Sequence, residues 1–342
     1  MLYFVVGPPG TFATWCGAVV AGLAGRVVGL IPIVEASTLD DISRKILSGN
    51  ISHAVIAATA PGGRLRAALA AAACPFVIAL DDPRLACADL VVGRQESLPV
   101  AVRQIASSCG AIMGLQSLPG ALVLRGDRDW SDIQAARALA DHFQFAVGDH
   151  DIAAVLEQIE RDHPAPQGDD VSSWWSRLVP SEEALMRGAL EPYFSRSETR
   201  RAPAISWAPE LFLLGDRPAE PATSAIDITG RARCLLHGPQ VLLFPGAWSL
   251  ALTLGFSRDA VDNEFLVEVA TDRQLASSGL RPHNEGDLTV ELAFLIDDSS
   301  DYPVVIRVST RRAAFDGAVI LRGARLLRHE DAGALDAAPP DG

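Results

Sequence analysis

The chain has 342 residues, of which 49% are hydrophobic and 21% charged, and its 42 acidic against 29 basic residues give a formal net charge of −13. This length predicts about two domains with substantial cores. The acidic balance, with Lys45 as the single lysine, argues against a general nucleic-acid or anionic-membrane surface, because binding to phosphates needs clustered Lys and Arg.

The five cysteines are scattered along the chain, and no two of them form a C-x-x-C pair. This usage predicts buried free thiols in a reducing compartment. The first residues lack a basic segment, and Pro8, Pro9 and Arg26 interrupt the apolar stretch that follows. We therefore expect no signal peptide and a cytoplasmic location.

Short apolar runs alternate with helical patterns through the first half of the chain. Runs buried on both faces are typical of parallel strands, and the alternation predicts a doubly wound α/β domain. The expected strands are residues 2–6, 27–34, 54–58, 76–80 and 121–124, and the expected helices between them are 11–23, 39–48, 64–73 and 100–108. From Trp130 to Arg161 the pattern is helical, with Ser131 as the expected N-cap.

Composition changes at residues 163–170, where Pro, Gly and Asp predict a linker. Farther on, apolar and polar residues alternate between turn signals, which predicts an antiparallel sandwich. The expected strands are 240–244, 248–256, 264–271, 287–296, 304–310 and 318–327. The expected fold class is thus α/β, a doubly wound parallel sheet, with a second, all-β antiparallel sandwich domain. The expected domains are 1–162 (α/β), 163–224 (linker and short helices), 225–329 (sandwich) and 330–342 (a disordered tail).

The first fifteen residues carry the strongest local pattern. Residues 2–15, LYFVVGPPGTFATW, predict a strand, a glycine-containing loop and a helix. Such a loop directs backbone N–H groups and a helix dipole at one point, which suits a phosphate or sulfate. The loop is neither a Walker A loop, which needs a Lys followed by Ser or Thr, nor a G-x-G-x-x-G fingerprint. A tight strand-to-helix turn without a ligand stays the alternative.

At this loop the sequence resembles the sulfotransferase family, whose P-loop-like P-[KR]-S-G-T-[ST]-W segment holds the 5′-phosphosulfate of PAPS. Residues 76–89, FVIALDDPRLACAD, resemble the family's second signature, a strand ending in R-D-P-R before a helix with a serine, which binds the 3′-phosphate. The resemblance implies cofactor-binding roles for Gly7, Pro9, Gly10, Thr11, Ala13, Thr14, Trp15 and Arg84. Glu35 stands where some members place the base that deprotonates the acceptor hydroxyl, and a solvated strand-end carboxylate is the alternative.

The chain departs from this family's pattern at groups that the chemistry needs. Proline replaces the loop cation at Pro8 or Pro9, Asp81 replaces the phosphate-binding arginine, and Asp89 replaces the serine. Carboxylates repel a nearby phosphate, and sulfuryl transfer benefits from a cation on the bridging oxygen. Arg84 and Arg26 are the candidates to supply the missing charge.

The C-terminal half resembles carbohydrate-binding jelly-roll modules. Their signature G-P-x-x-x-L-P-x-G-x-[YW] is similar to residues 238–248, GPQVLLFPGAW, except that Phe244 replaces a proline. The resemblance implies a sandwich that binds glycans through exposed aromatic side chains, or one that has become structural or partner-binding. Trp248 is expected in the core, with sugar stacking as the alternative. Trp174 and Trp175 predict either a glycan platform or a pair that seals a domain interface.

Acidic loops supply the remaining candidates for metal binding. Asp127 and Asp129 match the D-x-D of metal-dependent glycosyltransferases, whereas two acids in a short loop also occur by chance. A calcium loop or a solvated turn would each account for Asp297, Asp298 and Asp301. The histidines show no ligand spacing, so we predict no metal.

Two hypotheses for the function follow from these patterns. In the first, the chain is a sulfotransferase-like protein of bacterial polysaccharide modification or biosynthesis that transfers sulfate from PAPS to a glycan hydroxyl, with Glu35 as the base. In the second, it is a non-catalytic accessory protein that binds a glycan or a partner protein in polysaccharide synthesis. The expected partner is a glycan or polysaccharide, with a membrane-bound synthesis assembly as a further candidate and no nucleic acid. The sequence leaves the oligomeric state open.

Overall fold

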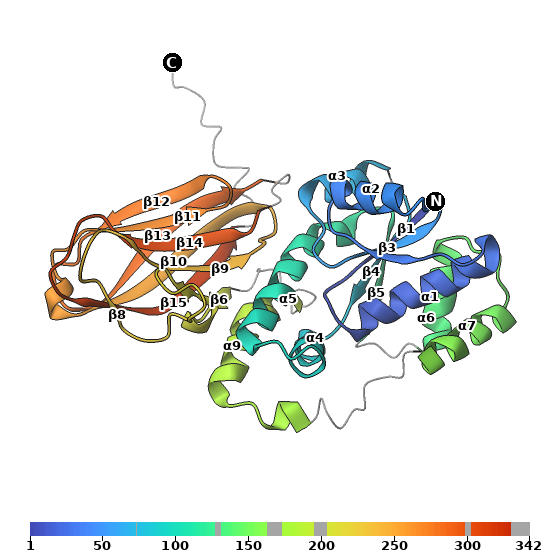
Figure 1. The fold of residues 1–342 in the computed structure, drawn as a ribbon, viewed down its shortest axis with the longest axis horizontal. Coiled ribbons are helices and arrows are strands. Elements are labelled where there is room, and N and C mark those ends of the chain that lie inside the picture. Colours follow the sequence, from blue (N-terminus) through green and yellow to red (C-terminus); the bar gives the residue numbers. More distant parts are fainter. Residues whose placement is uncertain (73, 127–130, 163–172, 195–203, 298–301, 330–342) are drawn as a thin grey trace, which may run out of the picture. The chain divides into compact units, whose positions relative to one another are not determined.

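Figure 1 shows the computed structural model, which describes residues 1–72, 74–126, 131–162, 173–194, 204–297 and 302–329. The chain divides into two compact units, Met1–Val179 and Pro180–Gly342. The first unit holds a parallel sheet with helices, and the second holds two antiparallel sheets. The predicted fold class is therefore confirmed.

The first unit is built on a five-stranded parallel sheet with the order β2-β3-β1-β4-β5. Its strands are β1 (Leu2–Val6), β2 (Ile33–Glu35), β3 (Ala54–Ala58), β4 (Phe76–Leu80) and β5 (Ala121–Arg125). The first strand lies at the centre, where Phe4 pairs with Ile56 of β3 on one side and with Phe76 of β4 on the other. Continuous apolar runs suit this position because both faces of the sheet are covered.

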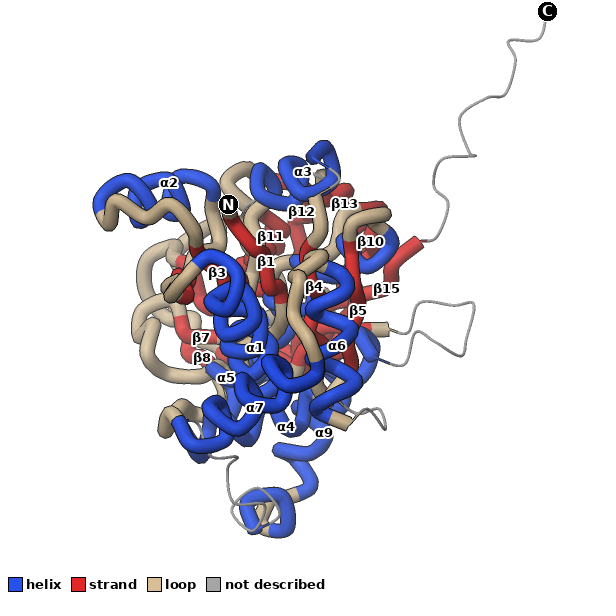
Figure 2. Tube along the Cα trace, turned by 90° about the vertical axis from the view of Figure 1, so that its right-hand side faces the viewer, coloured by secondary structure: helices blue, strands red, loops and turns tan. Residues whose placement is uncertain are grey.

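Helices cover both faces of this sheet, as the alternating pattern predicts. One face packs against α1, α6 and α7 in a core that contains Leu23, Leu139 and Val155, and Figure 2 shows these three helices together. The other face packs against α2, α3 and α5 through Ile42, Leu65 and Ile112. The helical segments are α1 (Thr11–Val28), α2 (Leu39–Ser48), α3 (Gly63–Ala72), α4 (Pro83–Ala88), η1 (Asp89–Gly93), α5 (Leu98–Ile112), η2 (Met113–Ser117), α6 (Asp132–His142) and α7 (Asp149–Asp162).

Local capping accounts for several helix boundaries. Ser131 caps α6 as expected: its hydroxyl accepts from Gln134 N at 3.3 Å, and Gln134 Oε1 accepts from Ser131 N at 3.0 Å. The expected strand at 27–34 is wrong over its first residues. Val27 and Val28 complete α1, which ends at Gly29 with a φ of +84°, so β2 starts only at Ile33.

Two helical stretches, Thr11–Val28 and Leu98–Ser117, are long and apolar enough to cross a membrane by length and composition. Both belong to the core of the α/β unit. The first buries Cys16, Val20 and Leu23, and the second buries Val102 and Ile105. Each stretch thus contributes buried side chains to the core of this unit.

The second unit is a sandwich of two five-stranded antiparallel sheets. One sheet has the path β13-β10-β15-β6 with β8 beside β15, and the other has the order β12-β11-β14-β9-β7. Phe256 of the first sheet packs on Phe265 of the second, with ring centroids 5.1 Å apart. The elements are α9 (Pro180–Phe194), β6 (Ile205–Trp207), η4 (Pro209–Leu211), β7 (Leu213–Leu214), β8 (Ile226–Asp227), β9 (Cys234–Val241), β10 (Gly246–Phe256), η5 (Arg258–Ala260), β11 (Phe265–Ala270), β12 (Gln274–Leu280), β13 (Gly286–Ile296), β14 (Val304–Thr310) and β15 (Ala318–His329).

The sandwich includes strands that the sequence analysis does not expect. Short strands β6 and β7 lie in the segment expected as linker, and they pair with β15 and β9. Strand β6 is three residues long and β7 two, which is too short to show a period. Strand β12 is a sheet edge without a buried residue, so its serines lack the apolar alternation that marks a half-buried strand.

Candidate functional site

The loop after β1 lies at the carboxyl end of the central strand, where open α/β sheets bind ligands. All four residues from Gly7 to Gly10 are buried, and Gly7 N donates to Ala58 O at 3.2 Å. A Cβ at Gly7 would stand 2.4 Å from Ala79 O, so this position requires glycine. The first turn of α1 follows at once, because Thr14 N and Thr14 Oγ1 both donate to Gly10 O, at 3.2 and 3.0 Å.

A carboxylate from a distant part of the chain lies at the start of α1. Thr11 N donates to Asp89 Oδ2 at 2.5 Å, and the Thr11 hydroxyl donates to the same oxygen. Asp89 follows α4 directly, and the first turn of α1 contains no acidic residue of its own. The negative charge at this helix N-terminus is therefore supplied from outside the helix, by Asp89.

Aromatic and small side chains complete the start of α1. Trp15 stacks on Phe12 with centroids 5.9 Å apart and planes inclined by 11°. Both rings pack against the core formed by α1, α6 and α7, as does Ala13. Pro9 is buried in the loop. These side chains thus pack the turn from the strand into the helix.

The end of β4 carries two further aspartates. Asp82 caps α4 by accepting from Arg84 N at 2.9 Å, and it accepts from Arg84 Nε at 2.9 Å through Oδ1 and at 2.8 Å through Oδ2. The Arg84 guanidinium also lies over the Trp175 ring, 5.4 Å from its centroid. Asp81 Oδ1 accepts from Asp82 N at 2.8 Å. The Arg84 guanidinium is therefore hydrogen-bonded to the carboxylate of Asp82, two residues before it.

The second candidate cation lies far from the loop. Arg26 is in the last turn of α1, whereas Thr11 is its first residue. At 1.5 Å per residue the two positions are about 22 Å apart along the helix axis. Arg26 therefore does not supply charge to the loop.

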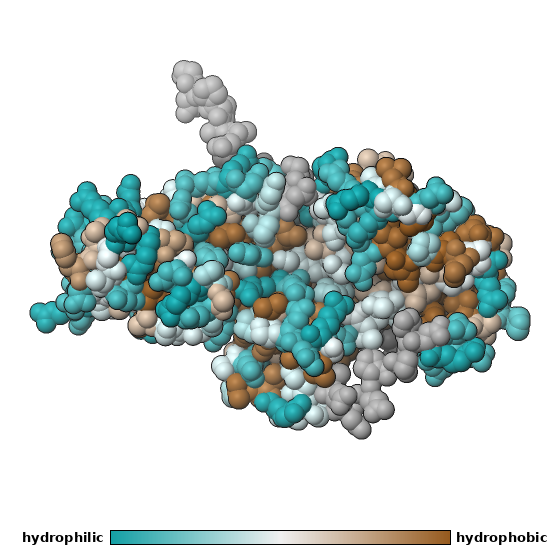
Figure 3. All heavy atoms as spheres, viewed as in Figure 1, coloured by the Kyte–Doolittle hydropathy of each residue, from teal (hydrophilic) through white to brown (hydrophobic). Residues whose placement is uncertain are grey.

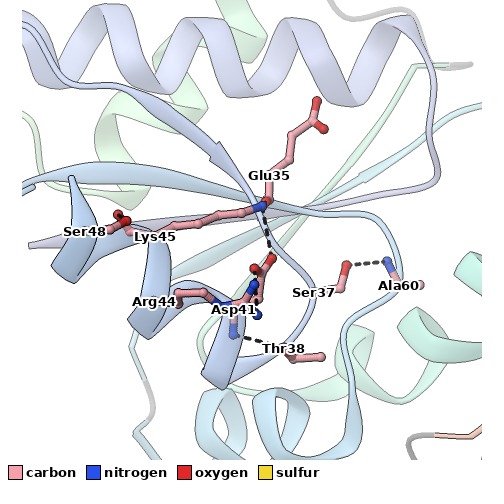
Figure 4. Close-up of polar contacts among 8 residues, drawn as sticks. All are labelled: Glu35, Ser37, Thr38, Asp41, Arg44, Lys45, Ser48 and Ala60. Atoms are coloured by element: carbon pink, nitrogen blue, oxygen red, sulfur yellow. Dashed lines mark hydrogen bonds and ion pairs between the residues drawn. The ribbon is translucent and has the colours of Figure 1, made fainter.

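Glu35 ends β2, at the edge of the sheet (Figure 4). Its backbone oxygen accepts from Lys45 Nζ at 2.6 Å, and Lys45 also pairs with Asp41 at 3.1 Å. The side chain of Glu35 is exposed and points away from both residues. Glu35 pairs with Ala57 of β3, and Ala57 pairs in turn with Val5 of β1. Glu35 is therefore two strands away from Val5. At a strand spacing of about 4.8 Å, its backbone stands about 10 Å from the strand that leads into the loop.

The residues at this end of the sheet do not fit the 5′-phosphosulfate or 3′-phosphate of PAPS. The amide and hydroxyl of Thr11 are bonded to a carboxylate, and the carboxylates of Asp81 and Asp82 follow β4 at the same end of the sheet. A phosphate oxygen would have to displace Asp89 and then lie beside it. Two charges 4 Å apart near a protein surface repel by up to about 4 kcal/mol, less where water screens them.

Three buried thiols flank this region. Burial, with a smaller contribution from Asp81, raises the pKa of Cys16 well above its usual range. Burial and the nearby Asp82 raise the pKa of Cys87 to about 12, and burial raises that of Cys109. All five cysteines are free, and Cys74 and Cys234 are half-buried. The three buried thiols are therefore packing groups, because a nucleophilic cysteine needs a lowered pKa.

In the second unit the signature tryptophan is a core residue. Trp248 is buried, and its Nε1 donates to Phe244 O at 3.0 Å, which leaves no face for sugar stacking. Two residues of the same signature, Gly238 and Gly246, have φ of +147° and +137°. Glycine tolerates these backbone angles, which other residues rarely adopt. Trp248, Gly238 and Gly246 therefore serve the packing and backbone geometry of the sandwich.

The exposed aromatic side chains of the sandwich belong to residues that the sequence analysis does not name. Phe315 is 99% exposed between β14 and β15, and Tyr302 is 54% exposed. In the α/β unit Trp174 is buried, and its ring centroid lies 6.0 Å from that of Trp175. Exposure is set by the turn that presents the ring, which single-sequence patterns do not show.

The acidic loops give no metal site among the residues that the structure describes. Within those ranges no group of three or more His, Cys, Asp or Glu side chains could hold a metal ion. Asp297 pairs with Arg273. The candidates Asp127, Asp129, Asp298 and Asp301 lie outside the described residues.

Comparison with known proteins gives similarities of fold. No known protein family matches the chain, and no curated protein matches it. A mouse sulfotransferase solved with PAP is 13% identical, with a TM-score of 0.42, over 57% of this chain and 84% of that protein. A family 61 carbohydrate-binding module solved with β-1,4-galactotriose is 12% identical, with a TM-score of 0.25, over 34% of this chain and 81% of the module. A carbohydrate-binding module from Cellvibrio mixtus lichenase 5A solved with cellotriose is 8% identical, with a TM-score of 0.22. The match covers 35% of this chain and 97% of the module. Similarities at this level assign no role to any residue of the chain.

Proposed function

We propose that the chain is a non-catalytic accessory protein of polysaccharide synthesis or modification. Its α/β unit keeps a sulfotransferase-like arrangement without the donor chemistry, and its sandwich binds a glycan or a partner protein. A cytoplasmic location, including attachment to a membrane-bound synthesis assembly, belongs to the same proposal.

The observation that carries this proposal is the bond between Asp89 and Thr11. An anion-binding loop works because the first amides of its helix are available to a ligand. Here the Thr11 amide and hydroxyl both donate to Asp89 Oδ2. The chain therefore supplies its own anion at the place where a donor phosphate would bind.

The distribution of cations supports the same conclusion. Arg84 is bonded through Nε to both oxygens of Asp82, and Arg26 is at the opposite end of α1. Lys45 is bonded to Glu35 O and Asp41 at the edge of the sheet. Sulfuryl transfer develops negative charge on the bridging oxygen, and positioned cations are the usual means of stabilising it.

The alternative function, a PAPS-dependent sulfotransferase with Glu35 as the base, is favoured by the retained strand, loop and helix. Isothermal titration calorimetry with adenosine 3′,5′-bisphosphate separates the two functions. The accessory role predicts no binding at millimolar nucleotide, and micromolar binding would establish the enzymatic alternative. The variant Asp89→Ser, which restores the family's residue, is the matched comparison.

Glycan binding by the sandwich is supported by the exposed ring of Phe315. Its loop is held by two reciprocal hydrogen bonds between Ala314 and Gly230, of 3.0 and 2.9 Å. A ring on an anchored turn can stack on a sugar at little cost in entropy. Screening of the wild type and Phe315→Ala on a glycan array tests this: a glycan retained by the wild type and lost in the variant supports it. Binding that Phe315→Ala leaves unchanged would assign the contact to another surface.

A further inference from the structure

Three loops that meet at one end of the sandwich carry positive charge, although the chain as a whole is acidic. The loops are residues 228–233, 257–260 and 311–317, and we call them together the arginine loops. They hold five arginines and two aspartates, a net charge of +3, whereas the whole chain carries −13. Figure 3 shows hydrophilic side chains over much of this end of the sandwich, beyond β8 at the left of the view. The arginines are Arg231, Arg233, Arg258, Arg311 and Arg312, and the aspartates are Asp259 and Asp316.

Backbone contacts hold the arginine loops together around the turn that presents Phe315. Ile228 N donates to Gly317 O at 3.0 Å, two residues after the exposed ring. Gly317 has a φ of +117°, and a Cβ there would stand 2.8 Å from Ala260 N. All three loops are therefore in direct contact beside the Phe315 turn.

Two arginines flank this turn with side chains that are free. Arg231 follows Gly230, which exchanges two hydrogen bonds with the Phe315 turn, and Arg258 lies two residues before Ala260. Both arginines are exposed, and neither side chain has a hydrogen bond or an ion pair with any residue that the structure describes. Their guanidinium groups are therefore available to an anion from outside the chain.

Two other arginines of the loops have partners within the sandwich. Arg233 donates to three backbone oxygens of residues 227–229, at 2.6 to 3.5 Å, and so fixes the loop that carries Arg231. Arg312 pairs with Glu264 at 3.3 Å. These two side chains thus support the loops from within.

The remaining charges leave this end of the sandwich positive. Asp316 Oδ1 accepts from Gly317 N at 2.7 Å, and Asp259 is exposed. Within the described part of the chain, neither aspartate forms an ion pair. Arg311 adds an exposed cation over β12, where its Nη1 lies 3.8 Å from the position that a Cβ at Gly279 would take. A polyanion is therefore attracted to the arginine loops and repelled by the acidic remainder of the chain.

A flat ring beside free guanidinium groups matches one class of glycan. The ring offers an apolar surface to the C–H face of a sugar, and a guanidinium donates paired hydrogen bonds to an oxyanion. We propose that the arginine loops bind a glycan that carries carboxylate or sulfate groups, with Arg231 and Arg258 on those groups and Phe315 against a sugar ring. This inference rests on the proposed role of the sandwich in glycan binding and adds the chemical class of the glycan.

Biolayer interferometry of the full chain on immobilised polysaccharides tests the proposal. Two matched pairs supply the probes: dextran sulfate with dextran for the sulfate group, and polygalacturonate with its methyl ester for the carboxylate group. We expect at least one acidic polymer to bind about tenfold or more tightly than its uncharged counterpart, and this binding to weaken as NaCl rises from about 50 to about 300 mM. The acidic polymer that binds identifies the anionic group.

The variants Arg231→Gln and Arg258→Gln should each weaken binding to the acidic polymer about threefold to fivefold, the size of an exposed charge interaction, and the double variant more. The matched control is Arg325→Gln. Arg325 is exposed in the middle of β15, outside the arginine loops, so this variant removes the same charge and should bind as the wild type does.

Equal affinity for the charged and uncharged polymers, no binding to either acidic polymer, or binding that both loop variants leave unchanged would overturn the proposal. So would equal affinity for a double-stranded DNA fragment, because that outcome marks the loops as a general polyanion surface. The glycan array separates this failure from that of the proposed function. Neutral glycans retained through Phe315 would keep glycan binding and reject the acidic class, whereas an empty array together with no binding to the polymers would reject both.

Discussion

The carboxylate of Asp89 accepts hydrogen bonds from both the backbone N–H and the hydroxyl of Thr11 at the first turn of α1. The two residues are 78 positions apart, so the bond joins the loop after β1 to the turn after α4. It satisfies a helix N-terminus that a ligand anion would otherwise satisfy. This contact joins the loop after β1 to the start of η1 within the α/β unit.

Replacing Asp89 by Asn should lower the free energy of unfolding of the α/β unit by about 1 kcal/mol. The amide oxygen can still accept from Thr11, but the negative charge at the helix N-terminus is lost. Urea denaturation measures the change. Glu160→Gln, an exposed neutralisation in α7, is the control and should have no effect. Equal stability of Asp89→Asn and the wild type would show that the contact contributes nothing.

Two glycines of α1 should respond in opposite directions to alanine. A Cβ at Gly22 would stand 2.6 Å from Val155 Cγ1, whereas a Cβ at Gly25 meets no atom within 4 Å. We expect Gly22→Ala to destabilise by about 1 to 3 kcal/mol through overpacking. Gly25→Ala should stabilise by about 0.5 to 1 kcal/mol through helix propensity. Thermal denaturation of the two variants checks the pair, and a loss of stability in Gly25→Ala would contradict the packing described for α1.

The single lysine should protect the edge of the sheet. Lys45→Met removes the donor to Glu35 O, so the amides of β2 should exchange faster with solvent, at a cost of about 0.5 to 1.5 kcal/mol. Hydrogen exchange at Ala36 N, which donates to Ala57 O at 3.0 Å, is the readout. Arg44→Met is the control, because Arg44 pairs with Asp41 at 3.4 Å without reaching the strand. Equal exchange rates at Ala36 N in both variants would show that the bond from Lys45 to Glu35 O does not protect the strand.

The buried thiols should make the α/β unit less stable at alkaline pH. Cys16, Cys87 and Cys109 have raised pKa values in the folded chain, with that of Cys87 raised to about 12. An unfolded thiol ionises near about 8.5. Between those values the folded state holds protons that the unfolded state has lost, so stability falls as pH rises.

Thiol labelling of the native protein at pH 8 provides the check. Cys74 and Cys234 are half-buried and should react first, and the three buried thiols should react only when urea unfolds the chain. Rapid labelling of all five thiols in the native state would show that these three positions are accessible.

Much of the fold follows from sequence patterns because long buried segments have clear periods. The five apolar runs lead to the strands of the parallel sheet, and Ser131 marks a helix start through its capping box. The exceptions have local causes. Val27 and Val28 carry the same apolar character in a helix as in a strand, and the short strand β6 is defined by its pairing with β15.

The sequence predicts where the loop of the candidate site lies, but not which side chains are bonded to one another there. The sequence predicts a strand, a loop and a helix over residues 2–15, which the structure has as β1, the loop and α1, and the aspartates at 81 and 89 indicate that negative charge lies near this turn. That the Asp89 side chain reaches Thr11 depends on the packing of η1 and α1, which lie far apart in sequence. The engagement of Arg84 by Asp82 is likewise a property of the folded turn.

The most direct test of the central claim is the NMR signal of the Thr11 amide during a titration with adenosine 3′,5′-bisphosphate. With the amide bonded to Asp89, its chemical shift in the wild type should stay constant to millimolar nucleotide, and it should move in Asp89→Ser when nucleotide or sulfate is added. A saturable shift of the Thr11 amide in the wild type at micromolar nucleotide would show that the loop accepts the donor, and would contradict a non-catalytic role.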